Sequence, residues 1–249
     1  MEGLTLEGRT ALVTGGAGGL GSGIARQLTA LGARVVIVDV NIDGAEKLAA
    51  DLDGALALAA DLSDPASIDS LIQQVKSEVG RVDVLVNNAG WDRIEPFLTS
   101  EPATWDRLFN INLRAPIHLT HAFLGAMVEQ QWGRLLYISS DAARVGSTGE
   151  SVYSACKAGL IGFSKTMARE SARAQVTSNV VCPGPSDTPL LAEVASDNPK
   201  LVESLKRSIP LGRLGQPDDI AGIVGFLTSE RAGYITGQTI SVSGGLTMI

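Results

Sequence analysis

Short apolar runs alternate with longer amphipathic segments along the whole sequence, and this order restricts the fold more than any other feature. The runs are rich in β-branched residues and show little polar alternation, which is typical of strands buried on both faces of a sheet. Seven such runs lie at Thr10–Thr14, Arg34–Asp39, Ala55–Ala59, Asp83–Asn87, Arg134–Ser139, Thr177–Cys182 and Gln238–Val242. The helical segments are Leu20–Leu31, Asp43–Asp53, Pro65–Val79, Thr104–Gln130, Val152–Ala172 and Pro217–Ser229. This order predicts βαβ units and therefore a doubly wound α/β fold with a parallel sheet.

The chain has 249 residues, enough for one large α/β domain or two small ones, and 45% of them are hydrophobic. No linker or repeat divides it, so we expect a single domain over residues 1–249. One segment, Pro185–Arg213, has four prolines and no predicted strand. It follows the sixth predicted strand, and ligands of such sheets bind beyond the carboxyl ends of strands. We predict a substrate lid at 185–213, with a passive surface excursion as the alternative.

The formal net charge of −7 argues against nucleic-acid or anionic-membrane binding, which requires a basic surface. No apolar run reaches the length of a membrane span, and the N-terminus lacks the apolar core of a secretion signal. The two cysteines, Cys156 and Cys182, form no C-x-x-C motif and suit buried, reduced thiols. We therefore expect a soluble cytoplasmic protein with neither nucleic acid nor membrane as a partner.

The first predicted strand runs into the glycine-rich turn Thr14-Gly15-Gly16-Ala17-Gly18-Gly19-Leu20-Gly21, which opens the first predicted helix. Glycines there let the backbone approach a pyrophosphate at the helix N-terminus; a tight turn without a ligand is the alternative. The second predicted strand ends at Asp39, eighteen residues after Gly21. A carboxylate there accepts hydrogen bonds from ribose hydroxyls and repels a 2′-phosphate, which favours NAD over NADP. A strand-end cap is the alternative role for Asp39.

Polar residues also follow the next two strands. The run Asn87-Asn88-Ala89-Gly90 closes the fourth strand, where its amides can join neighbouring strand ends and its glycine leaves room for a cofactor. Asp61 follows the third strand and either caps the helix that begins near Pro65 or reaches an adenine amino group. The residues alone leave these two roles equally open.

Tyr153 and Lys157 are one helical turn apart, so their polar ends share a helix face, and Ser140 lies thirteen residues before the tyrosine. A free phenol has a pKa of about 10, which a nearby cation lowers, so such a tyrosine can exchange a proton with an alcohol or carbonyl. Alone, this spacing is common and usually marks a solvated helix face. The only histidines, His118 and His121, have no third ligand nearby in the sequence, so we expect no metal site.

Together these motifs resemble the short-chain dehydrogenase/reductase family over essentially the whole chain. The glycine pattern, the Asn87–Gly90 run, Asn112, Ser140, Tyr153, Lys157 and Pro183-Gly184 occur in the family's order and spacing. The resemblance implies a single Rossmann-type domain with a seven-stranded parallel sheet. It also implies an oxidoreductase that uses NAD, and a homotetramer.

The resemblance implies roles for individual residues as well. Tyr153 would be the acid/base, Ser140 would bind the substrate oxygen, and Lys157 would bind the nicotinamide ribose and lower the tyrosine pKa. The backbone carbonyl of Asn112 would hold a water, and Thr188 would hold the nicotinamide carboxamide. The residues implied to bind the cofactor are Gly15, Gly18, Gly19, Leu20, Asp39, Asp61, Leu62, Asn88, Ala89, Gly90, Tyr153, Lys157, Pro183, Gly184 and Thr188.

Asn112 permits a sharper prediction. A carbonyl inside an α-helix normally accepts a hydrogen bond from the N–H four residues later, which here belongs to Pro116 and does not exist. If residues 104–130 are helical, we predict a kink or a bound water at Asn112. An unbroken hydrogen-bonded ladder through this residue would contradict the prediction.

Four residues outside the shared motifs are candidates for substrate binding: Trp91, Asp141, Arg144 and Glu150. The segments NNAGWD, SDAARVG and CPGPSDT resemble the branch that oxidises 2-hydroxycyclohexanecarboxyl-CoA with NAD, which implies a (cyclic) 3-hydroxyacyl-CoA substrate. Glu150 near the tyrosine would repel a free carboxylate, whereas a thioester is neutral. Arg144 could bind a substrate carboxylate or a CoA phosphate, or form an ion pair on the surface. Trp91 could pack against a ring of the substrate or belong to the protein core. The alternatives are a 3-oxoacyl-carrier-protein reductase, which the resemblance associates with NADPH, and a non-catalytic NAD-binding sensor.

Overall fold

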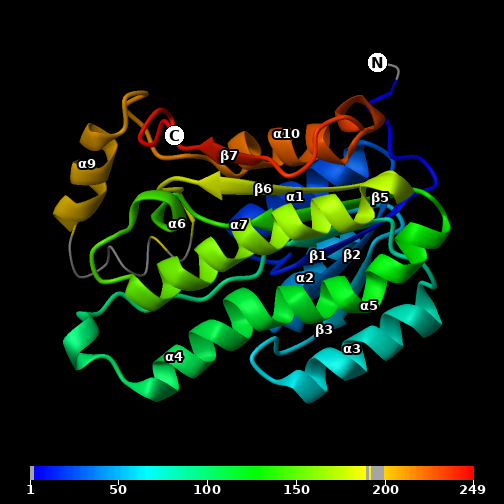
Figure 1. Ribbon diagram of the computed structural model, residues 1–249, viewed down its shortest axis with the longest axis horizontal. Coiled ribbons are helices and arrows are strands. Elements are labelled where there is room, and N and C mark those ends of the chain that lie inside the picture. The colour runs from blue at the N-terminus through cyan, green and yellow to red at the C-terminus, as the bar shows by residue number, and fades with distance from the viewer. Residues whose placement is uncertain (1–2, 189–190, 192–198) are drawn as a thin grey trace.

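Seven parallel strands form one sheet in the order β3-β2-β1-β4-β5-β6-β7 in the computed structural model, which describes residues 3–188, 191 and 199–249 (Figure 1). The strands are β1 (Thr10–Thr14), β2 (Arg34–Asp39), β3 (Leu56–Ala59), β4 (Val84–Asn87), β5 (Gly133–Ile138), β6 (Val176–Pro183) and β7 (Thr239–Val242). Each predicted strand is confirmed within one residue at either end. The predicted doubly wound α/β fold is therefore confirmed.

Helices cover both faces of the sheet because successive strand side chains point to opposite sides. Leu12 of β1 belongs to the apolar core on one face, and its neighbour Val13 belongs to the core on the other. The first face carries α3 (Pro65–Glu78), α5 (Ala115–Glu129) and α7 (Ser151–Ser171), and Figure 1 shows α5 and α7 in front of the sheet. The second carries α1 (Gly19–Ala30), α2 (Ile42–Ala50) and α10 (Pro217–Thr228). Three further helices, α4 (Pro102–Phe109), α6 (Ala142–Val145) and α9 (Pro199–Ser208), lie toward the carboxyl ends of the strands.

The start of α3 corrects one sequence interpretation. The carboxylate of Asp64 accepts the N–H of Ala66 at 3.0 Å, and Pro65 occupies the first helical turn, where a missing N–H costs nothing. Asp64 therefore caps this helix, and Asp61 does not. Asp61 instead accepts hydrogen bonds from the N–H and the hydroxyl of Ser63, at 2.8 and 2.7 Å.

The predicted long helix over residues 104–130 loses its regular α-helical geometry just before Pro116, as the missing N–H of that proline led us to expect. It consists of α4, one π-helical turn at Asn110–Arg114, and α5. In the π turn the N–H of Ala115 donates to the carbonyl of Asn110, five residues earlier. Pro116 follows directly, and its lack of an N–H removes one rung of a regular α-helical ladder. The predicted departure from a regular helix is confirmed, and the helical segment itself runs without a gap from Pro102 to Glu129.

The strand order reverses at β1, which pairs with β2 on one side and with β4 on the other. Ligands of open α/β sheets bind beyond the strand ends at such a switch point. The described residues of the predicted lid at 185–213 lie on this side. Residues 189–190 and 192–198 are outside the described residues, so the lid stays a prediction. Within the described residues no helix is long and apolar enough to cross a membrane.

The contact between α1 and α10 yields a stability prediction. A Cβ added at Gly23 of α1 would lie 2.8 Å from the Cβ of Pro217 at the start of α10, whereas one added at the exposed Gly222 would meet no atom within 4 Å. We expect Gly23→Ala to lower the free energy of unfolding by about 1–3 kcal/mol through overpacking. Gly222→Ala should raise it by about 0.5–1 kcal/mol, because alanine loses less backbone entropy in a helix. Urea unfolding measures both, and equal destabilisation by the two variants would contradict this packing.

Candidate active site

The ends of β1 and β4 are joined by the side chains of Thr14 and Asn88. The amide of Asn88 donates to the carbonyls of Thr14 and Gly15, at 2.9 and 3.1 Å. The hydroxyl of Thr14 accepts the N–H groups of Asn88 and Ala89, each at 3.1 Å. Asn88 therefore joins the ends of β1 and β4, as the sequence predicted. The neighbouring Asn87 takes no part, since its buried side-chain amide has no hydrogen-bond partner among the described residues.

The glycine turn leaves a backbone cradle at the N-terminus of α1. Gly15 adopts a φ of +62°, and a Cβ there would lie 2.8 Å from the Cα of Ala89. A Cβ at Gly21 would collide with the Gly15 carbonyl. Gly18 precedes α1 without a side-chain cap, and the first turn, from Gly19, holds no acidic residue. The free N–H groups and positive end of the helix therefore fit a pyrophosphate.

Asp39 lies where the adenosine ribose of a dinucleotide would be expected, at the end of β2. Its carboxylate accepts the N–H of Ala17 in the glycine turn and the N–H of Asn41, each at 3.0 Å. Asp39 therefore caps the end of its strand, and its hydrogen bond to Ala17 holds the glycine turn against β2. Asp61 follows β3, the strand that pairs with β2, and its hydrogen bonds with Ser63 hold its pKa below the ordinary value. The oxygen atoms of both side chains can accept hydrogen bonds from a ligand.

Other residues implied to bind a cofactor lie at neighbouring strand ends. Leu62 is buried in the core under the end of β3, and Leu20 packs partly against the core on the other face. Pro183 ends β6, and a Cβ on the following Gly184 would lie 2.7 Å from the Cβ of Ser243. The hydroxyl of Thr188 accepts the N–H of Leu191 at 3.4 Å.

Lys157 and Tyr153 project from α7 toward the ends of β4 and β5. The ammonium of Lys157, which is only 3% exposed, donates to the carbonyl of Ile138 at 2.9 Å and stands 5.7 Å from the ring centroid of Tyr153. Burial lowers the pKa of Lys157 to about 8. The absence of a side chain at Gly90 gives the ammonium room, since a Cβ there would lie 3.2 Å from Nζ. The predicted grouping of these two side chains is therefore present.

Tyr153 is held in its protonated form. Burial raises its pKa above the ordinary value, and the nearby carboxyl groups of Asp92 and Glu150 raise it further. A hydrogen bond with Ser140 opposes the rise. Lys157 was expected to lower this pKa, but its ammonium is bound to the Ile138 carbonyl, so burial and the two carboxyl groups prevail.

Asn112 in the π turn fixes the chain just after Gly90. Its side chain is fully buried, donates to the carbonyls of Trp91 (2.8 Å) and Leu108 (3.1 Å), and accepts the N–H of Trp91 at 3.2 Å. The Trp91 ring lies under the guanidinium of Arg107, 4.4 Å from its carbon. The family resemblance drew attention to the backbone carbonyl of Asn112; its side chain has this second, structural role.

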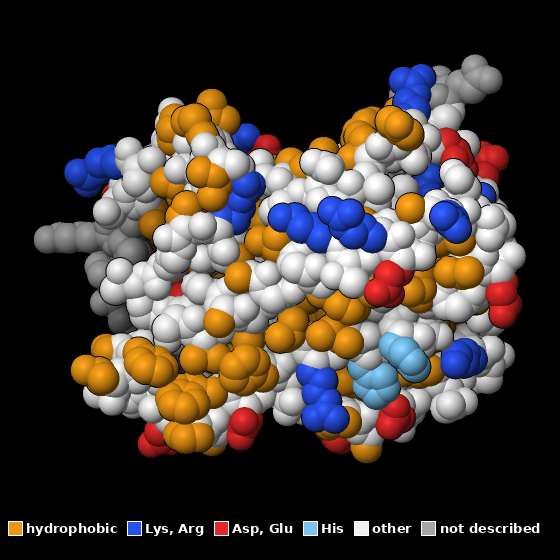
Figure 2. Space-filling view, viewed as in Figure 1, with side chains coloured by type: hydrophobic (Ala, Val, Ile, Leu, Met, Phe, Trp, Pro, Cys, Tyr) orange, Lys and Arg blue, Asp and Glu red, His pale blue; other side chains and the backbone are white. Residues whose placement is uncertain are grey.

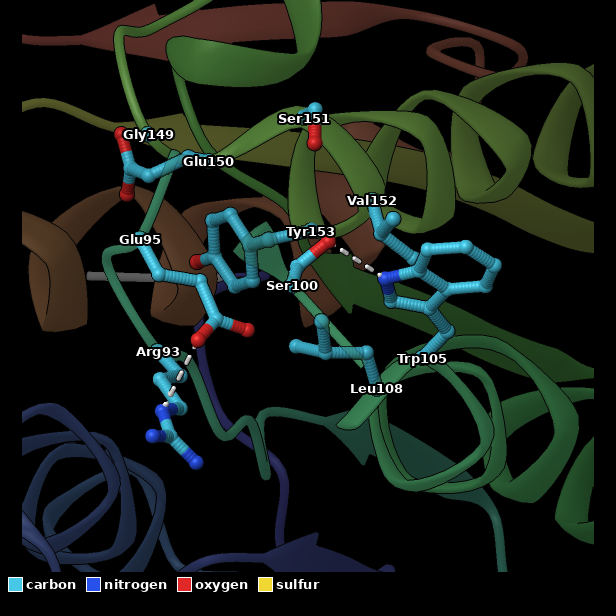
Figure 3. A pocket seen from close by; sticks show the side chains of 10 residues that line it. All are labelled: Arg93, Glu95, Ser100, Trp105, Leu108, Gly149, Glu150, Ser151, Val152 and Tyr153. Atoms are coloured by element: carbon cyan, nitrogen blue, oxygen red, sulfur yellow. Dashed lines mark hydrogen bonds and ion pairs between the residues drawn. The ribbon is translucent and has the colours of Figure 1, made fainter. Parts of the chain in front are cut away.

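A pocket beside Tyr153 contains one of the four predicted substrate residues, Glu150 (Figure 3). Figure 3 shows Glu150 and Glu95 on one side of the Tyr153 ring and Trp105 and Leu108 on the other. The residues that line the pocket are Arg93, Glu95, Ser100, Trp105, Leu108, Gly149, Glu150, Ser151, Val152 and Tyr153. Three of them, Arg93, Glu95 and Ser100, belong to the segment between β4 and α4, and two, Trp105 and Leu108, belong to α4. These five lie in no recognisable motif, and sequence reasoning therefore missed them.

Asp141 and Arg144 are turned toward the C-terminal strand. The carboxylate of Asp141 accepts the hydroxyl of Ser241 at 2.7 Å, and the guanidinium of Arg144 donates to the same hydroxyl oxygen at 2.9 Å. Arg144 also donates to the carbonyl of Ile249, the last residue. These contacts attach the segment after β5 to β7 and to the C-terminus, and Asp141 and Arg144 do not line the pocket.

Comparisons with known proteins agree with this geometry. The family model described as enoyl-(acyl carrier protein) reductase matches residues 15–247. The chain belongs to the short-chain dehydrogenase/reductase family. It is 39% identical over 247 residues to the 3-oxoacyl-[acyl-carrier-protein] reductases of Salmonella typhimurium and Escherichia coli (strain K12), covering 99% of this chain and 100% of each relative. As a member of this family it is an oxidoreductase that uses a nicotinamide cofactor.

Solved structures of this family superpose closely on the chain. The crystal structure of 3-ketoacyl-(acyl-carrier-protein) reductase from Brucella melitensis complexed with NADH has a TM-score of 0.90 and 35% identity, over 98% of this chain and 100% of that one. A putative gluconate dehydrogenase from Agrobacterium tumefaciens has a TM-score of 0.92 and 29% identity, over 99% of both chains. The seven-stranded parallel sheet is thus the family's own architecture.

The position of Tyr153 predicts the effect of removing its hydroxyl. We expect Tyr153→Phe to lower the rate of alcohol or ketone turnover about 10²–10⁴-fold, as for loss of a general acid or base. NADH binding, followed by the fluorescence of the cofactor, should stay close to that of the natural protein because the glycine cradle is untouched. Undiminished turnover by the variant would show that another group moves the proton.

Proposed function

We propose that this protein interconverts a 3-hydroxyacyl thioester and a 3-oxoacyl thioester by hydride exchange with NAD. The observation that carries the reaction type is the meeting of Ser140, Tyr153 and Lys157 beside the glycine cradle. When bound, the nicotinamide accepts a hydride from the carbinol carbon or returns it to the ketone carbon. The protein's own side chains handle the proton and the oxygen.

Tyr153 and Ser140 act on the reacting oxygen. In the oxidation, the phenolate of Tyr153 takes the hydroxyl proton as the hydride leaves the same carbon. In the reduction, the phenol of Tyr153 gives its proton to the oxygen as negative charge develops there. The hydroxyl of Ser140 donates to that oxygen and stabilises the charge, and both donors are preorganised by α7 and the end of β5.

The walls of the pocket support an acyl thioester. Glu150 lies beside Tyr153, so a free carboxylate at the reacting end of the substrate would be repelled, whereas the charge of Glu95 is offset by Arg93 at 3.2 Å. The pocket's other wall includes Trp105, whose ring is stacked on Phe97 with centroids 5.7 Å apart. Phe97 is 56% and Leu98 is 96% exposed, and Figure 2 shows apolar side chains gathered over this part of the molecule, at its lower left. A neutral thioester with an apolar acyl group suits both walls.

Two kinds of thioester are candidates, and their 3-oxoacyl groups react in the same way. The relatives that are 39% identical are reductases of the carrier-protein ester. This supports a 3-oxoacyl-carrier-protein reductase better than the cyclic hydroxyacyl-CoA dehydrogenase that the sequence segments suggested. One consideration favours the oxidation of a CoA ester such as 2-hydroxycyclohexanecarboxyl-CoA. A carboxylate at the end of β2, such as Asp39, would repel the 2′-phosphate of NADP, and NAD is the usual acceptor in oxidations. We therefore keep this dehydrogenase as the second candidate.

We also propose that the protein is a homotetramer of the cytoplasm. Apolar side chains are exposed on two separate surfaces, one with Phe109, Ile117 and Val128 along α4 and α5, and one with Met248 and Ile249 at the C-terminus. Two such surfaces suit the two kinds of contact in a dihedral tetramer. The buried free thiols Cys156 and Cys182 suit a reducing compartment. The net charge of −7 supports neither a nucleic-acid nor an anionic-membrane partner.

An activity screen with matched substrates tests the proposal. Linear and cyclic 3-hydroxyacyl-CoA esters are offered with NAD or NADP, and 3-oxoacyl esters of CoA and of carrier protein with NADH or NADPH, at equal concentrations. We expect turnover of thioesters and none of the free hydroxy acids, because the carboxyl groups beside Tyr153 repel the latter. Faster turnover of free hydroxy acids or of simple sugars than of every thioester would refute the proposed substrate class.

The same screen tests cofactor choice through Asp39. The natural protein should be more efficient with NAD than with NADP, and Asp39→Ala should narrow that ratio by about tenfold or more, since one repulsive charge near the 2′-phosphate is lost. Asp43→Asn, which removes an acidic charge in the first turn of α2, is the matched control and should keep the ratio. Equal efficiency of the natural protein with both cofactors would contradict the role of Asp39.

A further inference from the structure

The helix that follows Ser140 has little packing of its own. Helix α6 spans only Ala142–Val145, and none of its residues is buried. A single helical turn makes too few backbone hydrogen bonds to offset the entropy lost when it forms, and most helices in proteins are stabilised by an apolar face instead. Polar contacts to neighbouring elements therefore matter more for α6 than for the long helices.

The position of α6 affects the hydroxyl group of Ser140. The N–H of Ala142, at the start of α6, donates to the hydroxyl oxygen of Ser140 at 3.2 Å. The N–H of Ala143 donates to the carbonyl of Ser140 at 3.0 Å. Because a backbone N–H occupies one lone pair of the hydroxyl oxygen, the hydroxyl hydrogen is left to donate to another acceptor. The same N–H polarises the hydroxyl group and makes it a stronger donor.

Two charged side chains at α6 meet at one hydroxyl group of β7. The carboxylate of Asp141, which is only 5% exposed, accepts the hydroxyl of Ser241 at 2.7 Å. The guanidinium of Arg144 donates to the same hydroxyl oxygen at 2.9 Å. The second carboxylate oxygen of Asp141 is buried and has no hydrogen-bond partner among the described residues. Loss of the Ser241 hydroxyl would therefore leave a buried carboxylate poorly satisfied. We call Asp141, Arg144 and Ser241 the β7 brace.

The β7 brace connects α6 to the rigid edge of the sheet. The N–H of Asp141 donates to the carbonyl of Pro183 at the end of β6, at 3.0 Å. Arg144 also reaches the carbonyl of Thr239 on β7, at 3.5 Å. Strands β6 and β7 are themselves paired in the sheet. Contacts with two adjacent strands thus determine where α6 lies.

We propose that the β7 brace holds α6 so that the hydroxyl of Ser140 points at the reacting oxygen of the substrate, which makes its three members positioning residues. The proposal rests on the role proposed for Ser140 in the alcohol–ketone chemistry. No member of the brace lines the pocket beside the tyrosine, so the brace acts on the substrate through Ser140. When the brace is broken, the N–H of Ala142 moves away from the hydroxyl oxygen. Ser140 then stabilises the charge that develops on the substrate oxygen less well.

Amide hydrogen exchange without substrate tests whether the brace holds α6. It is followed by mass spectrometry on the peptide that contains residues 140–146. In Ser241→Ala we expect these amides to exchange roughly tenfold faster, because local opening of α6 becomes easier. Thr239→Val is the matched control, since it removes a buried hydroxyl without a described partner from the same strand. This control should keep the natural exchange rate. Unchanged exchange in Ser241→Ala would overturn the proposal.

A double-mutant cycle tests the effect on Ser140. The oxidation of 3-hydroxybutyryl-CoA with NAD is measured for Ser241→Ala and Arg144→Met, alone and combined with Ser140→Ala. Each brace variant alone should lower kcat roughly tenfold, a part of the 10²–10³-fold loss expected when one donor to a developing oxyanion is removed. The KM for NAD should change little. Combined with Ser140→Ala, each brace variant should lower kcat by less than about twofold, because the group that the brace positions is gone.

The cycle separates positioning from a merely structural role. Equal losses of kcat with and without the Ser140 hydroxyl would overturn the proposal. Arg144→Met decides the question if Ser241→Ala does not fold, since Arg144 is only half-buried. A natural protein that turns over no 3-hydroxyacyl thioester would refute the proposed function. In that case the exchange of residues 140–146 would still show whether the brace holds α6.

Discussion

The active site depends on one buried side chain, the amide of Asn112. It binds the N–H and carbonyl of Trp91 and the carbonyl of Leu108, and so ties the segment after β4 to the helix that crosses above it. A regular helix cannot continue through this point, because Pro116 supplies no N–H, and the chain adopts a π turn instead. The irregular turn therefore contains the residue that holds the loop. Gly90, where a Cβ would lie 3.2 Å from the Lys157 ammonium nitrogen, directly precedes Trp91, the residue that Asn112 holds.

The electrostatics of the site are set by burial more than by the expected lysine–tyrosine pair. Burial lowers the pKa of Lys157 and raises that of Tyr153, which brings both groups toward their neutral forms. The carboxyl groups of Asp92 and Glu150 act in the same direction on the tyrosine. A site arranged in this way is ready to donate a proton, which agrees with the reductase activity named for the relatives.

The sequence predicted the parts of the molecule that depend on local pattern. The parallel sheet followed from apolar runs such as Arg34–Asp39, and the cofactor cradle followed from a run of glycines, of which Gly15 and Gly21 leave no room for a side chain. The break near Asn112 followed from the chemistry of Pro116. Contacts between distant segments could not be predicted, because nothing local encodes them. One example is the contact of Arg144 with Ser241 and with the C-terminal residue, both of which lie about a hundred residues later in the sequence.

The family assignment rests on the whole chain, and the proposed chemistry rests on a few atoms around Tyr153. The central claim is direct hydride exchange between a carbinol carbon and the nicotinamide at that point. It is tested most directly by incubating the protein and NAD with a 3-hydroxyacyl-CoA that carries deuterium on the carbinol carbon, and examining the NADH by mass spectrometry. We expect each NADH formed to carry one deuterium, because the hydride never exchanges with water. NADH formed without deuterium, or a labelled substrate that is never oxidised, would contradict it.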